Sequence, residues 1–146
     1  MNQTRKLVSL GLLAVVLGIS ACSAWMPSTT VQLSAKLSGA SEVPPNASTG
    51  AGTLQASLDK QTNVLKWTVT YSGLTGPVKA AHFHGPAAAG ANAGVAQGFS
   101  GSLDSPIQGT ATLTPAQAAD VLAGKWYANL HTAANPGGEI RGQLTP

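Results

Sequence analysis

Short runs of alternating apolar and polar residues, separated by turns rich in glycine and proline, constrain the fold of this chain more than any other feature. In the first run, residues 31–38, Val31, Leu33, Ala35 and Leu37 alternate with polar residues. Because successive side chains of a strand point to opposite faces, such a run predicts a strand with one buried face. The remaining runs predict strands around residues 54–58, 65–71, 78–84, 95–103, 107–113, 125–131 and 139–144.

The composition agrees with many short strands joined by tight turns. Only 9% of the 146 residues are charged, and the chain contains 17 glycines and 9 prolines. A helical protein would be richer in glutamate, lysine and leucine. We therefore expect a single all-β domain, an antiparallel Greek-key sandwich or barrel of about seven or eight strands.

One short helix is predicted near residues 114–123. Thr114 has a side chain suited to the N-cap, Pro115 suits the first helical position, and Gln117 completes a capping box. Gly124 suits the residue that follows a helix end. These signals predict both ends of the helix.

The N-terminal part of the chain has the pattern of an export signal. Arg5 and Lys6 precede an apolar stretch at residues 7–19, which is short for a membrane span because a span needs roughly 20 residues. The stretch ends in Ile-Ser-Ala-Cys at residues 19–22, which resembles the bacterial lipobox. In lipobox proteins the signal is cut before the cysteine, which is acylated. The alternative is an ordinary signal cut nearby, for example after Ala24.

The lipobox interpretation divides the chain into a signal peptide at residues 1–21, a tether at residues 22–30 and a folded domain at residues 31–146. Lipidated Cys22 would anchor the protein to a membrane of the cell envelope, because several acyl chains make a stable anchor. In a Gram-negative host, Ser23 resembles a signal for sorting to the outer membrane, on the side of the periplasm. Cys22 is the only cysteine, so the mature domain has no internal disulfide and no thiolate ligand.

Charge and motifs weigh against several classes of function. The formal net charge is +3, but loss of Arg5 and Lys6 with the signal leaves six basic side chains against five acidic ones. Without a basic stripe, nucleic-acid binding has little support. The mature sequence also lacks a Gly-x-Ser-x-Gly motif, a phosphate-binding loop and a nucleophilic cysteine, so neither a hydrolase nor a nucleotide-binding protein is indicated.

The three histidines of the chain, His82, His84 and His131, carry the main functional signal. His82 and His84 share one face of the predicted strand at residues 78–84. His131 shares the polar face of the predicted strand at residues 125–131. The opposite faces are apolar, so the histidines are expected outside the core. Two imidazoles at i and i+2 can reach one ion, and a third completes a neutral three-nitrogen site of the kind that suits copper or zinc.

Two interpretations of the histidines remain open. Either they bind a metal ion, with copper first and zinc as the alternative, or they hydrogen-bond to loops and order the segments rich in glycine and proline. Two known arrangements that begin with His-x-His do not fit. A cupin has a glutamate ligand within a few residues, which residues 85–88 do not supply, and a metallo-β-lactamase has an aspartate and another histidine just after.

The polar faces of the last two predicted strands supply neighbours for the histidines. If these strands pair across their loop, Glu139 falls near His131 and Arg141 falls near Asn129. Glu139, Tyr127 and Asn129 would then surround the site, and Glu139 or Tyr127 could orient a histidine ligand. The alternative for Glu139 and Arg141 is a cross-strand ion pair on the surface, worth under about 1 kcal/mol.

Five segments match a known domain in order: residues 37–45 (LSGASEVPP), 72–75 (SGLT), 80–86 (AAHFHGP), 127–132 (YANLHT) and 135–142 (NPGGEIRG). They resemble the CHRD domain, which is repeated in the animal developmental protein chordin and occurs alone in many bacterial exported proteins. The resemblance covers about residues 31–144. It implies an exported β domain, and the chordin context implies a role in adhesion or protein binding.

A fainter similarity is to Cu/Zn superoxide dismutase, a Greek-key barrel whose copper lies outside the core. A Gly-Leu turn at residues 73–74, the pair at residues 82 and 84, His131 and Arg141 would occupy matching positions. The similarity implies that Arg141 is a catalytic residue that attracts superoxide, a small anion. The disulfide and the zinc ligands of that enzyme are missing, so a copper-only site is the most that the similarity implies.

Three hypotheses of function follow. The first is a copper-binding envelope protein for storage, delivery or protection, and the second is a copper oxidoreductase of the superoxide dismutase kind. The third is an adhesion or protein-binding module without a metal.

Overall fold

The structure is a computed structural model that describes residues 28–146. The predicted signal peptide and the predicted acylation site, Cys22, lie outside these residues. Within the described part of the chain, no helix is long and apolar enough to cross a membrane.

Eight strands and one α-helix form this part of the chain, which confirms the prediction of an all-β fold with one short helix. The elements are β1 (Thr30–Ser38), the 3₁₀ turn η1 (Gly39–Ser41), β2 (Ala51–Asp59), β3 (Val64–Ser72), β4 (Val78–His84), β5 (Val95–Gly98), β6 (Ile107–Thr112), α1 (Pro115–Leu122), β7 (Trp126–Thr132) and β8 (Ile140–Leu144).

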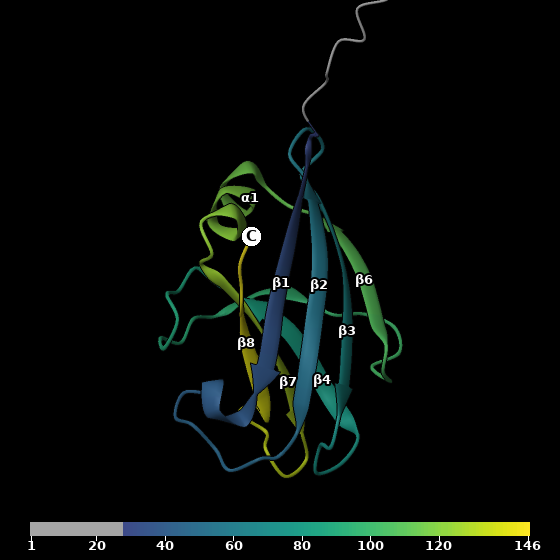
Figure 1. The fold of residues 1–146 in the computed structure, drawn as a ribbon, viewed down its shortest axis with the longest axis vertical. Coiled ribbons are helices and arrows are strands. Elements are labelled where there is room, and N and C mark those ends of the chain that lie inside the picture. Colours follow the sequence, from purple (N-terminus) through teal and green to yellow (C-terminus); the bar gives the residue numbers. More distant parts are fainter. Residues whose placement is uncertain (1–27) are drawn as a thin grey trace, which may run out of the picture.

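All strand pairs are antiparallel, and the strands form one nearly closed, barrel-like sheet in the order β5-β4-β7-β8-β1-β2-β3-β6. Neighbours such as β4 and β7 are distant in sequence, as expected of a Greek-key arrangement. Figure 1 shows η1 and the β7–β8 turn at one end of the barrel, with α1 and the C-terminus toward the other end.

The core consists of the apolar faces that the alternation predicts. In β4, Ala81 and Phe83 are buried, and in β7 the same holds for Trp126, Ala128 and Leu130. Aromatic rings pack edge to face within this core, with the ring centroids of Trp67 and Phe83 5.2 Å apart. The histidines therefore lie on strands whose other face is fixed by core packing.

The helix α1 begins and ends close to the predicted residues. The Thr114 hydroxyl accepts a hydrogen bond from the Gln117 backbone N–H, and the Gln117 side chain accepts one from the Thr114 N–H. Ala118 and Val121 bury the inner side of the helix against the core. Gly124 follows the helix with a φ of 67°, a conformation that favours glycine.

One predicted strand is shorter in the structure. The expected strand at residues 95–103 ends as β5 at Gly98. The reason is that Phe99 turns toward the barrel interior and packs against the core, with its ring centroid 4.8 Å from that of Phe83. The following loop then packs on β3, and the Leu103 carbonyl accepts a hydrogen bond from the Tyr71 hydroxyl at 2.7 Å.

Candidate metal centre

The structure brings the three histidines together on the outer face of β4 and β7. These strands pair directly, with His82 opposite Asn129 and His84 opposite Tyr127. One ring nitrogen from each of His82, His84 and His131 lies within 4.8 Å of the others, and the three side chains are half-buried. A three-histidine group is therefore geometrically possible.

Two of the three nitrogens already have the spacing of metal ligands. The Nδ1 atom of His82 lies 3.2 Å from Nε2 of His131. Two nitrogens about 2.0 Å from one tetrahedral ion lie about 3.3 Å apart. For the third bond, a ring nitrogen of His84 would exchange its present oxygen partner, Ala93 or Asn129, for the ion.

Backbone carbonyls face one ring nitrogen of two histidines. The Ala93 carbonyl lies 3.0 Å from Nδ1 of His84, and the Pro136 carbonyl lies 3.0 Å from Nδ1 of His131. A carbonyl can only accept, so Nδ1 of His131 carries the proton and its Nε2 can offer a lone pair. Nε2 of His84 also faces an oxygen, that of Asn129, so in the neutral His84 ring only one of the two nitrogens donates and the other can offer a lone pair. Hydrogen bonds of this kind to the second ring nitrogen are typical of metal-binding histidines.

The environment also favours neutral imidazoles. Burial, with smaller contributions from His131 and His84, holds the pKa of His82 below its ordinary 6.5. Burial lowers the pKa of His131 as well, against the hydrogen bond to the Pro136 carbonyl, which raises it. Neutral imidazoles are the form that binds a metal ion, so the residues fit a copper or zinc ion.

Tyr127 and Arg141 lie behind His84 in a stack. The rings of Tyr127 and His84 are parallel, with an angle of 3° and centroids 4.9 Å apart. The Cζ atom of Arg141 lies 3.4 Å from the centroid of the Tyr127 ring. An imidazole and a guanidinium at these separations cannot share one face of a ring, so Tyr127 separates the two.

Arg141 is paired with Asn129 in the sheet, as expected, but its guanidinium is not an open anion site. Only 2% of the residue is exposed. Its terminal nitrogens donate to the Asn92 side-chain oxygen at 2.8 Å and to the Ala91 carbonyl at 2.6 Å. The structure therefore places Arg141 where it fastens the loop before β5, with Tyr127 between it and the histidines.

Glu139 lies near the end of the barrel and is fully buried. Its oxygens accept from the hydroxyls of Ser48, Thr75 and Thr132, and from the Thr75 backbone N–H at 2.8 Å. Burial raises the pKa of this carboxyl, but these hydrogen bonds outweigh it and lower the pKa to about 2. The described contacts of the carboxylate are with hydroxyl and amide groups, and none is with a histidine.

Asn129 is the predicted neighbour that contacts a histidine through a hydrogen bond. Its side-chain oxygen lies 3.0 Å from Nε2 of His84. Tyr127 contributes through its ring stack on His84, and its hydroxyl bonds to both the N–H and the carbonyl of Ala93. The same Ala93 carbonyl faces His84, so Tyr127 and Asn129 hold this histidine from two sides.

The polar side of β7 and β8 is more buried than the sequence suggests. Tyr127, Asn129, Glu139 and Arg141 are each less than 5% exposed, whereas strand alternation predicts an outer, polar face. Loops from other parts of the chain cover these residues. The predicted surface ion pair between Glu139 and Arg141 is absent from the described residues, where the one ion pair joins Lys125 and Asp120.

Sequence reasoning did not select Glu42, which the structure buries beside Asn129. Glu42 is 6% exposed, and its Oε1 atom has no hydrogen-bond partner. Burial raises its pKa to about 7, although Arg141, Asn129 and the Val43 N–H act in the opposite direction. Glu42 belongs to a segment that matches the CHRD domain. That match was the only feature of the sequence that pointed to this residue.

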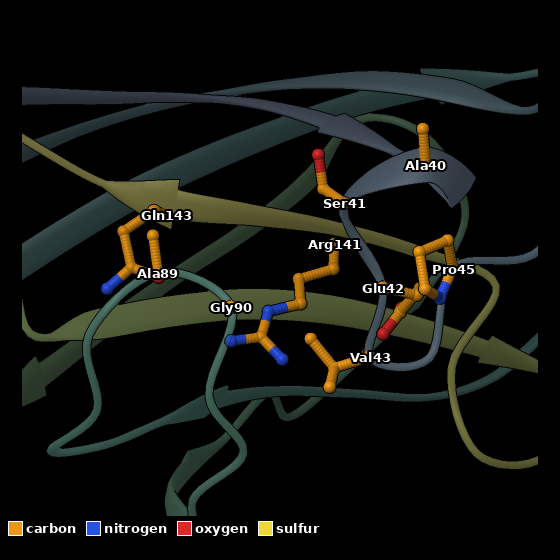
Figure 2. A pocket seen from close by; sticks show the side chains of 9 residues that line it. All are labelled: Ala40, Ser41, Glu42, Val43, Pro45, Ala89, Gly90, Arg141 and Gln143. Atoms are coloured by element: carbon orange, nitrogen blue, oxygen red, sulfur yellow. The ribbon is translucent and has the colours of Figure 1, made fainter.

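Glu42 and Arg141 line a common cavity of about 470 Å³. Figure 2 shows the two side chains entering it from different elements, Glu42 from the segment after η1 and Arg141 from β8. The cavity lies on the Arg141 side of Tyr127, so it is separate from the histidine cluster.

Fold and site together define the class of this protein, an antiparallel β-barrel domain that carries a three-histidine group outside its core. The chain belongs to the CHRD domain family, which matches residues 33–144. No curated protein and no solved structure matches the chain.

Proposed function

We propose that this CHRD domain binds one copper ion through His82, His84 and His131. The observation that carries the proposal is the 3.2 Å approach of His82 Nδ1 to His131 Nε2, together with the carbonyl that holds the proton of His131 on its other nitrogen. Three neutral nitrogen donors suit copper first and zinc second.

We place the domain in the cell envelope, held to a membrane by acylated Cys22. The lipobox-like sequence at residues 19–22 supports this location. A half-buried, partly accessible histidine site suits exchange of copper with other molecules, so storage, delivery or protection is the role that we propose first.

Superoxide dismutation is a second candidate function. A copper ion would supply a centre that cycles between two oxidation states and leaves a position for a small anion. His82, His84 and His131 would hold it, and Tyr127 and Asn129 would keep His84 in place. The burial of Arg141 behind Tyr127 weakens this candidate, because the guanidinium does not face the histidines. A metal-free adhesion or protein-binding module is the remaining alternative.

Copper titration of the purified protein tests the proposal. We expect about one equivalent of Cu(II) in the unaltered protein and loss of that equivalent in the double variant His82→Ala, His84→Ala. The matched control is Lys79→Ala, an exposed residue of the same strand, which should retain full copper uptake. Circular dichroism checks that each variant is folded.

Each outcome of the titration decides between the functions. Equal copper uptake by the unaltered protein and the double variant overturns the three-histidine site, and no uptake by a folded protein favours the binding module. A dismutase assay on the copper-loaded protein then separates the two copper hypotheses. Turnover that His131→Ala abolishes supports the enzyme, and stoichiometric copper without turnover supports storage or delivery.

A further inference from the structure

Glu42 is a buried carboxyl group, one oxygen of which has no hydrogen-bond partner in the described structure. It is 6% exposed, and its Oε1 atom accepts no hydrogen bond. Buried acidic groups are rare unless they are paired, because the cost of removing a charge from water is not recovered. The positive charge of Arg141 lowers the pKa of Glu42, but the two form no ion pair in the described structure.

The guanidinium of Arg141 is already engaged elsewhere. It lies over the Tyr127 ring and donates to Asn92 and to the Ala91 carbonyl. These contacts direct Arg141 toward the loop that contains Ala91 and Asn92. The unpaired oxygen of Glu42 therefore needs a different explanation.

The unpaired oxygen lies beside the amide of Asn129. A side chain placed on Gly138 would come within 2.5 Å of Glu42 Oε1 and within 2.6 Å of Asn129 Nδ2, so both atoms flank one point. Gly138 has a φ of 130°, and its lack of a side chain is what lets the carboxyl and the amide lie so close. No residue with a side chain fits between them.

The other end of the same amide reaches the histidine cluster. Asn129 Oδ1 lies 3.0 Å from Nε2 of His84. Glu42, Asn129 and His84 thus form a chain from an unpaired carboxyl to the candidate metal ligands. Many metal-binding histidines contact a carboxylate directly, and here an amide stands between the two groups.

We propose that Glu42, acting through Asn129, is the buried counter-charge of the three-histidine site and makes it favour a doubly charged metal ion over a singly charged one. This inference rests on the proposed metal site. Imidazoles bind metal ions in their neutral form, and three of them by themselves accept Cu(I) as well as Cu(II). A negative charge nearby stabilises each ion in proportion to the ion's charge, and Glu42 carries that charge above its pKa of about 7.

The proportionality gives the proposal a quantitative signature. Glu42→Gln removes the charge and preserves the shape of the side chain. We expect it to weaken Cu(II) and Zn(II) binding by about tenfold or more. The loss for Cu(I) should be close to the square root of that factor, because the ion carries half the charge. A merely structural role would weaken all three ions by the same factor.

The experiment measures the affinities of the full-length purified protein for Cu(II), Zn(II) and Cu(I) by competition with chelators of known affinity. Glu42→Asp keeps the charge and should retain most of the preference for divalent ions. Asp104→Asn removes an exposed carboxylate and should change no affinity. Thermal unfolding of the metal-free variants checks folding independently of metal binding.

The outcomes separate this inference from the proposed site. If the unaltered protein binds none of the three ions, the proposed metal site is wrong, and the proposed role of Glu42 is wrong as well. If it binds them and a folded Glu42→Gln protein keeps the same ratio of Cu(II) to Cu(I) affinity, the counter-charge is wrong while the three-histidine site stands.

Discussion

At the scale of single residues, Glu139 and Glu42 are two buried carboxyl groups with opposite surroundings. Glu139 accepts hydrogen bonds from three hydroxyls and one backbone N–H. These donors come from separate segments, the loop before β2, the β3–β4 turn and the end of β7. Glu139 therefore joins loops at one end of the barrel, whereas Glu42 has an unpaired oxygen beside the amide of Asn129.

Replacement of Glu139 by glutamine should destabilise the domain. A glutamine side chain offers one oxygen acceptor in place of two, and its amide nitrogen faces hydroxyls that now lack a charged acceptor. We expect a loss of roughly 2–4 kcal/mol in the free energy of unfolding, measured by urea denaturation of the metal-free protein. Asp104→Asn, an exposed carboxylate, should change it by less than about 0.5 kcal/mol. Equal losses in both variants would show that the network contributes nothing specific.

At the scale of elements, the strands and the helix could be predicted because their signals are local. Alternation located β4 with its bounds and assigned Phe83 to the core and His82 to the outer face. Alternation does not report what covers the outer face. Residues such as Asn129 are buried because loops without any periodic pattern fold over them, and the approach of Glu42 to Asn129 depends on a glycine far away in sequence, Gly138.

The helix α1 provides a prediction at this scale, because a single capping box supplies the side-chain hydrogen bonds at its N-terminus. Thr114→Ala removes the hydroxyl that accepts from the Gln117 N–H at 3.2 Å. We expect a loss of about 1 kcal/mol in the free energy of unfolding and an unchanged copper affinity, since α1 does not contribute to the site. Thr110→Ala on the exposed face of β6 is the matched control and should cost only about 0.5 kcal/mol or less. Loss of copper affinity in Thr114→Ala would contradict the separation of helix and site.

At the scale of the whole molecule, the two carboxyl groups make stability depend on pH in opposite directions. The pKa of Glu139 is lowered to about 2, so its stabilising effect is present above its ordinary pKa of 4.5 and is lost as the pH falls toward 2. The pKa of Glu42 is raised to about 7, so its favourable effect is present below 4.5 and is lost as the pH rises through 7. The lowered pKa values of His82 and His131 act against Glu42 in the same range, because these histidines disfavour folding as the pH falls below 6.5.

A difference between two proteins isolates the contribution of Glu42 from that of the histidines. In the metal-free state, Glu42→Gln should gain stability relative to the unaltered protein as the pH rises from 4.5 to above 7. A pKa raised from 4.5 to about 7 sets the size of this relative gain at roughly 3 kcal/mol or less. Urea denaturation at a series of pH values in the presence of a chelator measures it, and the histidine contributions cancel because both proteins contain them. A constant difference in the free energy of unfolding between the two proteins across this range would mean that Glu42 is paired or hydrated in the folded protein. That result would contradict its role as an unpaired counter-charge for a bound cation.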